Sequence, residues 1–460
     1  MAADIEKPPP QHNPTTTTTN NATTPPPSPP LSLAAADHAP PPSPPPPPDG
    51  GLRAWTQVLA GHLCVFNTFG QINSFGIFQA YYTSHLPLPP STISWIGTLQ
   101  ILLIYGLATF SGRALDAGFL RCTLALGTAL QLLGIFATSG ASTYWQLLLA
   151  QGVCQGLGMG LVFCPAVANA ATFFERRRVV AVSCVACGGA TGGMVFPAIA
   201  QTLLGRVGFA WTVRVMGFVV AGNGAVVLAL ARARGDGEEE DGEGEGKERG
   251  KKKKERAPLI EWAAFRETPY SLYCVSMFFA FWGIWIAYYY VRAYARDILH
   301  LSDRSSFNLI LLINGVGVPG RLVPALLADR FFGPVNVFIP VILLAGLCLF
   351  CWHAVASSAG MTAFVVFYGF FGAGTQSLLQ AALASLNTDV KKAGVRIGMG
   401  FSVVGLASLT GSPIGGALIE RRGGDYLYAQ MFAGATMVLG SLILVAARVA
   451  KTGFVLRARM

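Results

Sequence analysis

The stretch DGGLRAWTQVLAGHLCVFNTFGQINSFGIFQAYY, Asp49 to Tyr82, is the natural place to begin. From Ala54 onward it contains no Lys, Arg, Asp or Glu. With a rise of about 1.5 Å per residue, a helix of this length crosses a hydrocarbon core of about 30 Å with some tilt. Its interior amides need partners or water at that depth, and they are Asn67, Gln71 and Asn73. The stretch predicts the first of several membrane-spanning helices.

The composition of the whole chain agrees with a membrane protein. The 460 residues are 52% hydrophobic and only 12% charged, whereas a soluble domain is nearer to about one quarter charged. The formal net charge of +10 comes mainly from short loops between apolar runs. Basic residues in such loops set membrane topology, so we exclude nucleic acid as a partner. The nine cysteines lie mostly inside apolar runs, which indicates small buried residues rather than disulfides.

Two segments of biased composition divide the chain. Residues 1–48 are rich in Pro and Thr and predict a disordered cytosolic tail. Residues 233–267 join an acidic Gly/Glu block to a lysine run and predict a charged cytosolic linker. The halves on either side, 49–232 and 268–450, each have room for about six spans, and 451–460 form a short cytosolic tail. The predicted class is an all-α polytopic membrane protein with about twelve transmembrane helices in two six-helix halves.

Basic residues are biased toward one predicted side of the membrane. A cytosolic N-terminus places on the inside Arg113, Arg121, the arginines of 176–178 and the basic C-terminal residues. It leaves outside Arg206, the group Arg292, Arg296 and Arg304, and the pair Arg421 and Arg422. The balance predicts that both termini and the linker are cytosolic. We expect the plasma membrane to be the location.

A short motif recurs at matching places in the two halves. GRALDAGFLR, residues 112–121, follows the second predicted span, and GRLVPALLADRFFG, residues 320–333, closes the eighth. The matching positions are Gly112, Asp116, Gly118 and Arg121 in the first copy and Gly320, Asp329, Arg330 and Gly333 in the second. Equivalent motifs at equivalent places predict two pseudo-symmetric repeats.

These motifs resemble the signature loop of the major facilitator superfamily. In that family the loop aspartate engages helix ends and arginines on the cytosolic side and steadies the outward-open state. PDGGLRAW, SFGIFQAYY and FSVVGLASLTGSPIGGALIE are further similar to the monocarboxylate-transporter-like branch, especially its fungal members. The resemblance implies the twelve-helix fold and transport of small organic solutes by alternating access. Fungal relatives include riboflavin facilitators and transporters tied to secondary metabolism.

Arg321 is the principal candidate for substrate binding. It lies within the eighth predicted span with no acidic residue one turn away. A charge at mid-membrane costs about 2.5–3.5 kcal/mol on insertion scales, so such residues usually face a cavity. Two interpretations stay open: Arg321 faces the cavity, or it snorkels to the cytosolic edge and pairs with Asp329. The resemblance implies the first, because an arginine at this place in the family contacts the substrate carboxylate.

Proton coupling is not predicted. The animal carboxylate carriers keep an aspartate and a lysine where this chain has Gly317 and Asn73. No Asp or Glu lies deep within any predicted span, and a proton symporter normally needs such a group. His62 lies inside a span but near its cytosolic end, which favours a packing role. Facilitated diffusion or exchange is expected.

Further polar and aromatic residues are candidates for the cavity lining. They are Asn67, Gln71, Asn73, Asn314, Gln376, Gln380 and, from the aromatic face of the seventh span, Tyr289. For the amides the competing interpretation is an interhelical hydrogen bond, worth about 0.6 kcal/mol on average. For the aromatic face it is the interfacial belt.

The predicted function is transmembrane transport of a small organic solute, either monocarboxylate-like or ring-bearing. Alternatives are efflux of a fungal secondary metabolite, and a receptor or scaffold built on a transporter fold. An enzyme is not predicted, because no nucleophile elbow, HExxH or Walker-type motif occurs. No cofactor or metal is predicted, since the two Cys-x-x-Cys pairs lie in apolar helices without further ligands nearby.

Overall fold

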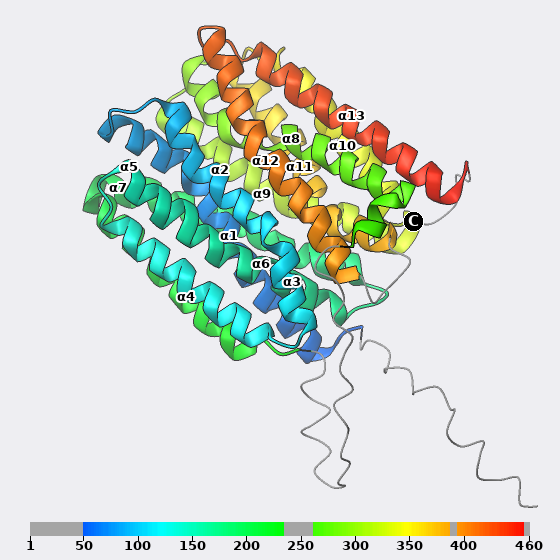
Figure 1. The fold of residues 1–460 in the computed structure, drawn as a ribbon. Coiled ribbons are helices and arrows are strands. Elements are labelled where there is room, and N and C mark those ends of the chain that lie inside the picture. The colour runs from blue at the N-terminus through cyan, green and yellow to red at the C-terminus, as the bar shows by residue number, and fades with distance from the viewer. Residues whose placement is uncertain (1–48, 234–260, 387–392, 455–460) are drawn as a thin grey trace, which may run out of the picture. The chain divides into compact units, whose positions relative to one another are not determined.

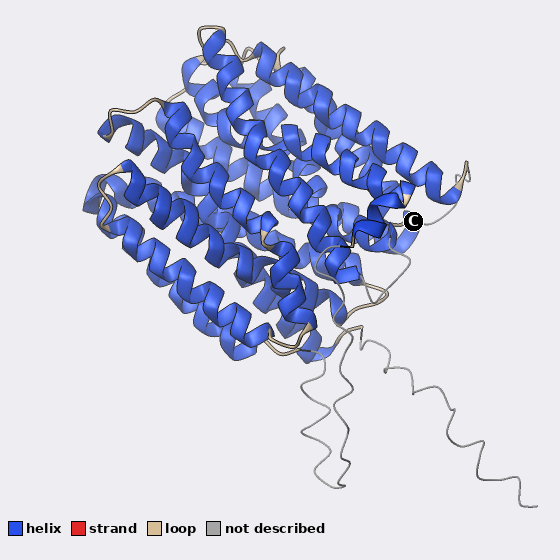
Figure 2. Ribbon diagram, viewed as in Figure 1, coloured by secondary structure: helices blue, strands red, loops and turns tan. Residues whose placement is uncertain are grey.

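A computed structural model describes residues 49–233, 261–386 and 393–454, and every regular element in these ranges is a helix (Figure 2). All of them belong to the compact unit that begins at Pro47. The predicted tail 1–48 and most of the predicted linker lie outside the described residues, as do 387–392 and 455–460.

The first half of the described chain consists of seven α-helices and one π-helix. They are α1 (Gly51–His85), α2 (Pro90–Gly106), α3 (Ala108–Asp116), α4 (Leu120–Ser139), α5 (Tyr144–Leu147), η1 (Leu148–Gln155), α6 (Gly156–Thr172) and α7 (Arg178–Leu230). The second half contains η2 (Trp262–Arg266), α8 (Thr268–Asp297), α9 (Asp303–Leu327), η3 (Ala328–Phe332), α10 (Pro334–Trp352), α11 (Ser358–Leu386), α12 (Ala393–Arg421) and α13 (Leu427–Thr452).

The described helices supply twelve membrane crossings. Ten are long and apolar enough to cross a membrane by length and composition. One of these, the 53-residue α7, is two crossings, because Gly208 takes a left-handed φ of 77° and interrupts the helix. The 35-residue α1 is the twelfth crossing; its amides and glycines lower its hydropathy. The predicted all-α polytopic class is confirmed.

One predicted boundary was wrong. The sequence pattern places residues 112–121 beyond the end of the second span. In the structure the helical path continues from Thr92 to Asp116, so most of the motif forms the last helical turns. The turn comes at Gly118, where φ is +88°. The apolar run stops at Phe110, but a helix end needs a residue that can leave helical geometry, and Gly118 is that residue.

Glycines allow the closest helix packing in the first half. α1 packs along the first leg of α7, and a Cβ at Gly188 would collide with the carbonyl oxygen of His62. Gly192 meets Phe66 in the same way. In lipid, helices associate mainly through such close packing. These glycines therefore let the backbones of α1 and α7 approach closely.

The two halves meet along two pairs of helices. α12 packs along α2 and α3 (Figure 1), and α7 packs along α9. An even number of crossings returns the chain to the side on which it starts. We call the side on which α1 begins and α13 ends the termini side, and the other the opposite side.

Candidate functional site

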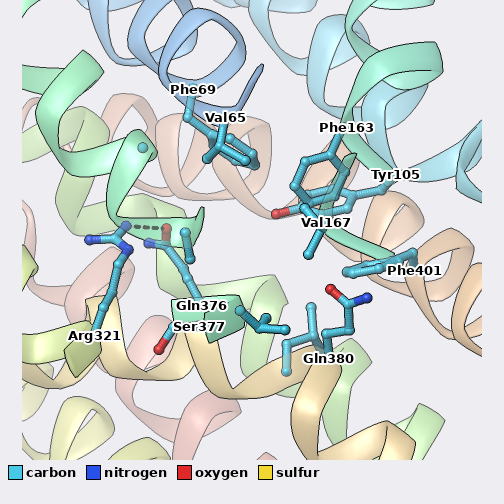
Figure 3. Close-up of a pocket in the computed structure, with 14 residues that line it drawn as sticks. Val65, Phe69, Tyr105, Phe163, Val167, Arg321, Gln376, Ser377, Gln380 and Phe401 are labelled. Carbon is cyan, nitrogen blue, oxygen red and sulfur yellow. Dashed lines mark hydrogen bonds between the residues drawn. The ribbon is translucent and has the colours of Figure 1, made fainter. Parts of the chain in front are cut away.

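A cavity of about 50 Å³ lies between the two halves. Its main lining residues are Val65, Phe69, Tyr105, Phe163 and Val167 from the first half and Arg321, Gln376, Gln380 and Phe401 from the second (Figure 3). One water molecule needs about 10–15 Å³ by this measure, so the cavity has room for only a few. Both halves must move apart before a metabolite can enter it.

Arg321 is buried in the wall of this cavity, with 5% of its surface exposed. Its Nη1 donates to the carbonyl of Gly317 at 3.1 Å, and its Nη2 donates to Oε1 of Gln376 at 3.0 Å (Figure 3). Its Nε is buried without a hydrogen-bond partner. Among the described residues no carboxylate forms an ion pair with it. The guanidinium therefore faces the cavity and does not pair with Asp329.

The cavity offers donors and no negative charge. Neither Asp, Glu nor His occurs in its lining among the described residues. The Nε2 amide of Gln376 is buried without a partner, as is the Nε of Arg321. The hydroxyl of Tyr105 points toward the same space (Figure 3). A buried donor left unpaired costs about 1–3 kcal/mol, so the geometry suits a ligand that brings acceptor oxygens.

Aromatic rings from both halves form the rest of the wall. Phe69 stacks on Trp285 with centroids 6.4 Å apart, and Tyr105 stacks on Phe401 at 5.7 Å. Phe163 meets Phe401 edge-on at 5.6 Å. Each pair joins a first-half helix to a second-half helix. Such faces suit a flat, ring-containing solute.

The termini side of the cavity is closed. The hydroxyls of Thr109 and Ser402 lie 3.2 Å apart across the α3–α12 contact. The carboxylate of Asp329 accepts hydrogen bonds from the backbone N–H of Val179 at 3.2 Å and of Val180 at 2.9 Å. Asp329 lies in η3 of the second half and those N–H groups begin α7 of the first half. A carboxylate at a helix N-terminus is stabilising, so this contact fastens the two halves together.

The opposite side holds a larger cavity of about 500 Å³, which we call the vestibule. Its lining includes Asn73 of α1 and Tyr288, Tyr289 and Arg292 of α8. With closed contacts on the termini side and open space on the other, the protein opens toward the opposite side. Trp285 contacts Phe69 of the central cavity as well as Tyr288 and Tyr289 of the vestibule. The Phe69–Trp285 pair thus stands between the two spaces.

The structure separates the predicted site residues into groups. Arg321, Gln376 and Gln380 line the central cavity; Asn73 and Tyr289 line the vestibule. The other three lie elsewhere. Asn67 bonds to the Val220 carbonyl and to Asn223, Gln71 lines a separate cavity of about 20 Å³ inside the first half, and Asn314 donates to the Ile310 carbonyl.

Some lining residues were missed by the sequence analysis. Tyr105, Phe163 and Phe401 are apolar or aromatic residues in apolar runs, and nothing in the pattern distinguishes them from lipid-facing ones.

His62 bonds through Nδ1 to the Cys184 carbonyl at 2.9 Å and through Nε2 to Thr191 at 3.1 Å. These bonds tie α1 to α7, as a packing role requires.

The signature motifs make contacts at helix ends. Arg121 donates from Nε to the carbonyl of Ala231 at 2.9 Å, just beyond the end of α7. Gly112 is buried and Asp116 is exposed on the last turn of α3. Arg330 lies over the ring of Phe331 at 5.3 Å. The hydrogen bonds of Asp329 cross between the halves.

A buried ionic cluster on the termini side was not predicted. Arg396, near the start of α12, donates to Glu261 at 3.1 Å and to Glu267 at 2.6 Å. The cluster fastens η2, where the described second half begins, to α12. Two acidic residues six positions apart, just ahead of a span, were a signal that the sequence analysis did not use.

Comparison with known proteins gives consistent matches. The family model described as Major Facilitator Superfamily matches residues 62–398. The chain is 42% identical over 402 residues to an MFS-type transporter of Gibberella zeae, covering 87% of each chain. It is 34% identical over 374 residues to the MFS-type transporter dbaD of Emericella nidulans, covering 81% of this chain and 80% of the relative. It is 33% identical over 399 residues to the aspyridones efflux protein apdF of the same organism, covering 86% and 77%.

Proposed function

The chain belongs to the major facilitator superfamily, and from that premise we propose that it exports a ring-bearing organic anion of the secondary-metabolite class. It is a multi-pass membrane transporter, and alternating access between its two halves moves the solute. We propose three further properties: the solute is an anion, it contains a ring, and transport is outward.

Arg321 carries the anion part of the proposal. A guanidinium stays protonated at any working pH and presents a planar fork to carboxylate-like oxygens. Here the fork is buried, forms no ion pair with a described carboxylate, and has an unused Nε donor beside the unused amide of Gln376. An anionic solute would satisfy both donors and the charge. The stacked aromatic pairs in the same wall support the proposal that the solute contains a ring.

The relatives support an outward direction of transport and a solute of the secondary-metabolite class. One of them is named as an efflux protein for aspyridones, and we extend export, though not that substrate, to this chain. The resemblance to monocarboxylate carriers agrees with Arg321 as the anion-binding group. It does not extend to their proton coupling, because Gly317 and Asn73 stand at the coupling positions. Facilitated movement or exchange is the mode we propose.

The proposed orientation has both termini and the linker in the cytosol and the vestibule outside, at the plasma membrane. The excess of basic residues on the termini side supports it. Epitope tags at both termini and in the linker should resist external protease in intact cells. Cleavage of the linker tag by external protease would show that the orientation is the reverse of the one proposed.

Flux through proteoliposomes tests the function. Naphthalene-2-sulfonate is a permanently charged, ring-bearing probe, and 2-naphthyl glucoside is a neutral one that also crosses bare bilayers poorly. We expect faster flux of the sulfonate. Arg321→Gln should slow sulfonate flux at least about tenfold, because a hydrogen bond to a charged group contributes about 1.5–3 kcal/mol, and Arg321→Lys should keep part of it.

Arg206→Gln, which changes an exposed arginine outside the cavity, is the matched control and should leave the flux unchanged. Equal or faster flux of the glucoside in the wild-type protein would overturn the anion proposal. No flux of either probe would favour a receptor or scaffold instead.

A further inference from the structure

Arg292 places a second, half-buried cation in the vestibule. It lies on α8 and its side chain is 21% exposed. Its Nη2 donates to Oε1 of Gln201 on α7 at 3.3 Å, so the side chain points across to the other half and not into lipid. Its Nε is buried without a hydrogen-bond partner.

The charge of Arg292 is poorly compensated. It forms a long ion pair with Asp303, whose Oδ1 lies 4.0 Å from Nη2 and whose side chain is 73% exposed. A solvated pair at that distance contributes little. The next cation along the helix, Arg296, has its own partner, because its Nε bonds to Asp297 at 2.9 Å. The charge of Arg292 is therefore less well compensated than that of Arg296, and Arg292 can bind an anion in the vestibule.

Two tyrosines line the same space. The hydroxyl groups of Tyr288 and Tyr289 are buried without hydrogen-bond partners, and both residues line the vestibule. Tyr290 differs, because its hydroxyl donates to the Ser412 carbonyl at 3.3 Å. The vestibule thus shares with the central cavity an arginine Nε without a partner and a lining of aromatic rings. Its volume of about 500 Å³ falls within the usual range of small-molecule sites, about 300–1,000 Å³.

We propose that Arg292, with Tyr288 and Tyr289, forms a second binding site for the same organic anions as the central cavity. This rests on the proposed function. The two sites are separated by the Phe69–Trp285 pair, so an anion that leaves Arg321 passes this pair and meets Arg292 next. The second site lowers the barrier to release, because the anion does not go directly from a fixed charge into bulk water.

Isothermal titration calorimetry on the full-length protein, with naphthalene-2-sulfonate as the probe, tests the proposal through stoichiometry. The wild-type protein should bind two molecules per chain. Arg292→Gln should leave one site and raise the Kd of the other at least about tenfold, since a bond to a charged group is lost. Arg321→Gln should remove the other site. Arg304→Gln, an exposed arginine on the same side, should retain both.

Each outcome separates the two proposals. Two sites in Arg292→Gln, or a single site in the wild-type protein that is lost in Arg321→Gln, would overturn the vestibule site alone. Two sites that both survive in Arg321→Gln would overturn the proposed central site. Since Arg292→Gln should keep the site at Arg321, retained binding there also shows that this variant is folded.

Discussion

Asp329→Asn should shift the carrier toward opening on its termini side. The carboxylate accepts the backbone N–H groups of Val179 and Val180, at 3.2 and 2.9 Å, and holds η3 of one half to α7 of the other. These bonds exist only while the halves are closed on this side. Their loss therefore destabilises this conformation relative to the one that opens there.

The magnitude follows from the two bonds. Asparagine keeps one acceptor oxygen but loses the charge that complements the helix N-terminus. Helix capping contributes about 0.5–2 kcal/mol, and a negative charge at a helix N-terminus about 0.3–1 kcal/mol. A combined loss of about 1–2 kcal/mol changes the ratio of the two conformations by about 5–30-fold.

Cys187 is a native reporter of this change. It lies on α7 against α9, its Sγ is 3.9 Å from the Val318 carbonyl, and 6% of its surface is exposed. Opening the termini side unpacks α7 from α9 and exposes it. Alkylation by N-ethylmaleimide, measured by mass spectrometry and normalised to the exposed Cys122, should be about 5–30-fold faster in Asp329→Asn than in the wild-type protein.

Asp425→Asn provides a matched control. Asp425 also accepts a backbone N–H at the start of a helix, that of Leu427 at 3.0 Å, but both residues belong to the second half. Its loss should leave the alkylation of Cys187 unchanged. An unchanged rate in Asp329→Asn, or an equal increase in both variants, would refute the reasoning.

Three further predictions concern other parts of the molecule. Gly188→Ala should lower the melting temperature in detergent, because overpacking against the His62 carbonyl costs about 1–3 kcal/mol, whereas Gly222→Ala, with open space at its Cβ, should not lower it. Backbone hydrogen bonds, of which that from Glu175 is the strongest, lower the pKa of Asp49 below its ordinary value. The stability that Asp49 adds is therefore present above pH about 4 and is lost as the pH falls through the lowered pKa. The melting temperatures of the wild-type protein and of Asp49→Asn should differ at pH 7 and converge in acid. Asp116→Asn should slow transport strongly at unchanged expression, and wild-type flux in that variant would limit the first motif to a topological role.

The crossings were largely predictable from sequence, because hydropathy reports depth in the bilayer directly. The division of α7 at Gly208 gives the first half the six crossings that its length predicts. The site was predictable only in part. Sequence places Asn67 and Arg321 inside spans alike, but it does not tell which face of each helix looks toward the axis between the halves. Asn67 therefore bonds within the first half while Arg321 faces the cavity. The aromatic lining was hidden because rings at the axis and rings in lipid look alike in sequence.

The Phe69–Trp285 pair also has an electrical consequence. Protons and ions leak through a membrane protein along unbroken files of water, and apolar constrictions interrupt such files by dewetting. Here the central cavity holds only a few waters, stacked rings separate it from the vestibule, and the termini side is closed. In this conformation the carrier is an insulator. A cell can keep many idle copies without dissipating its membrane potential.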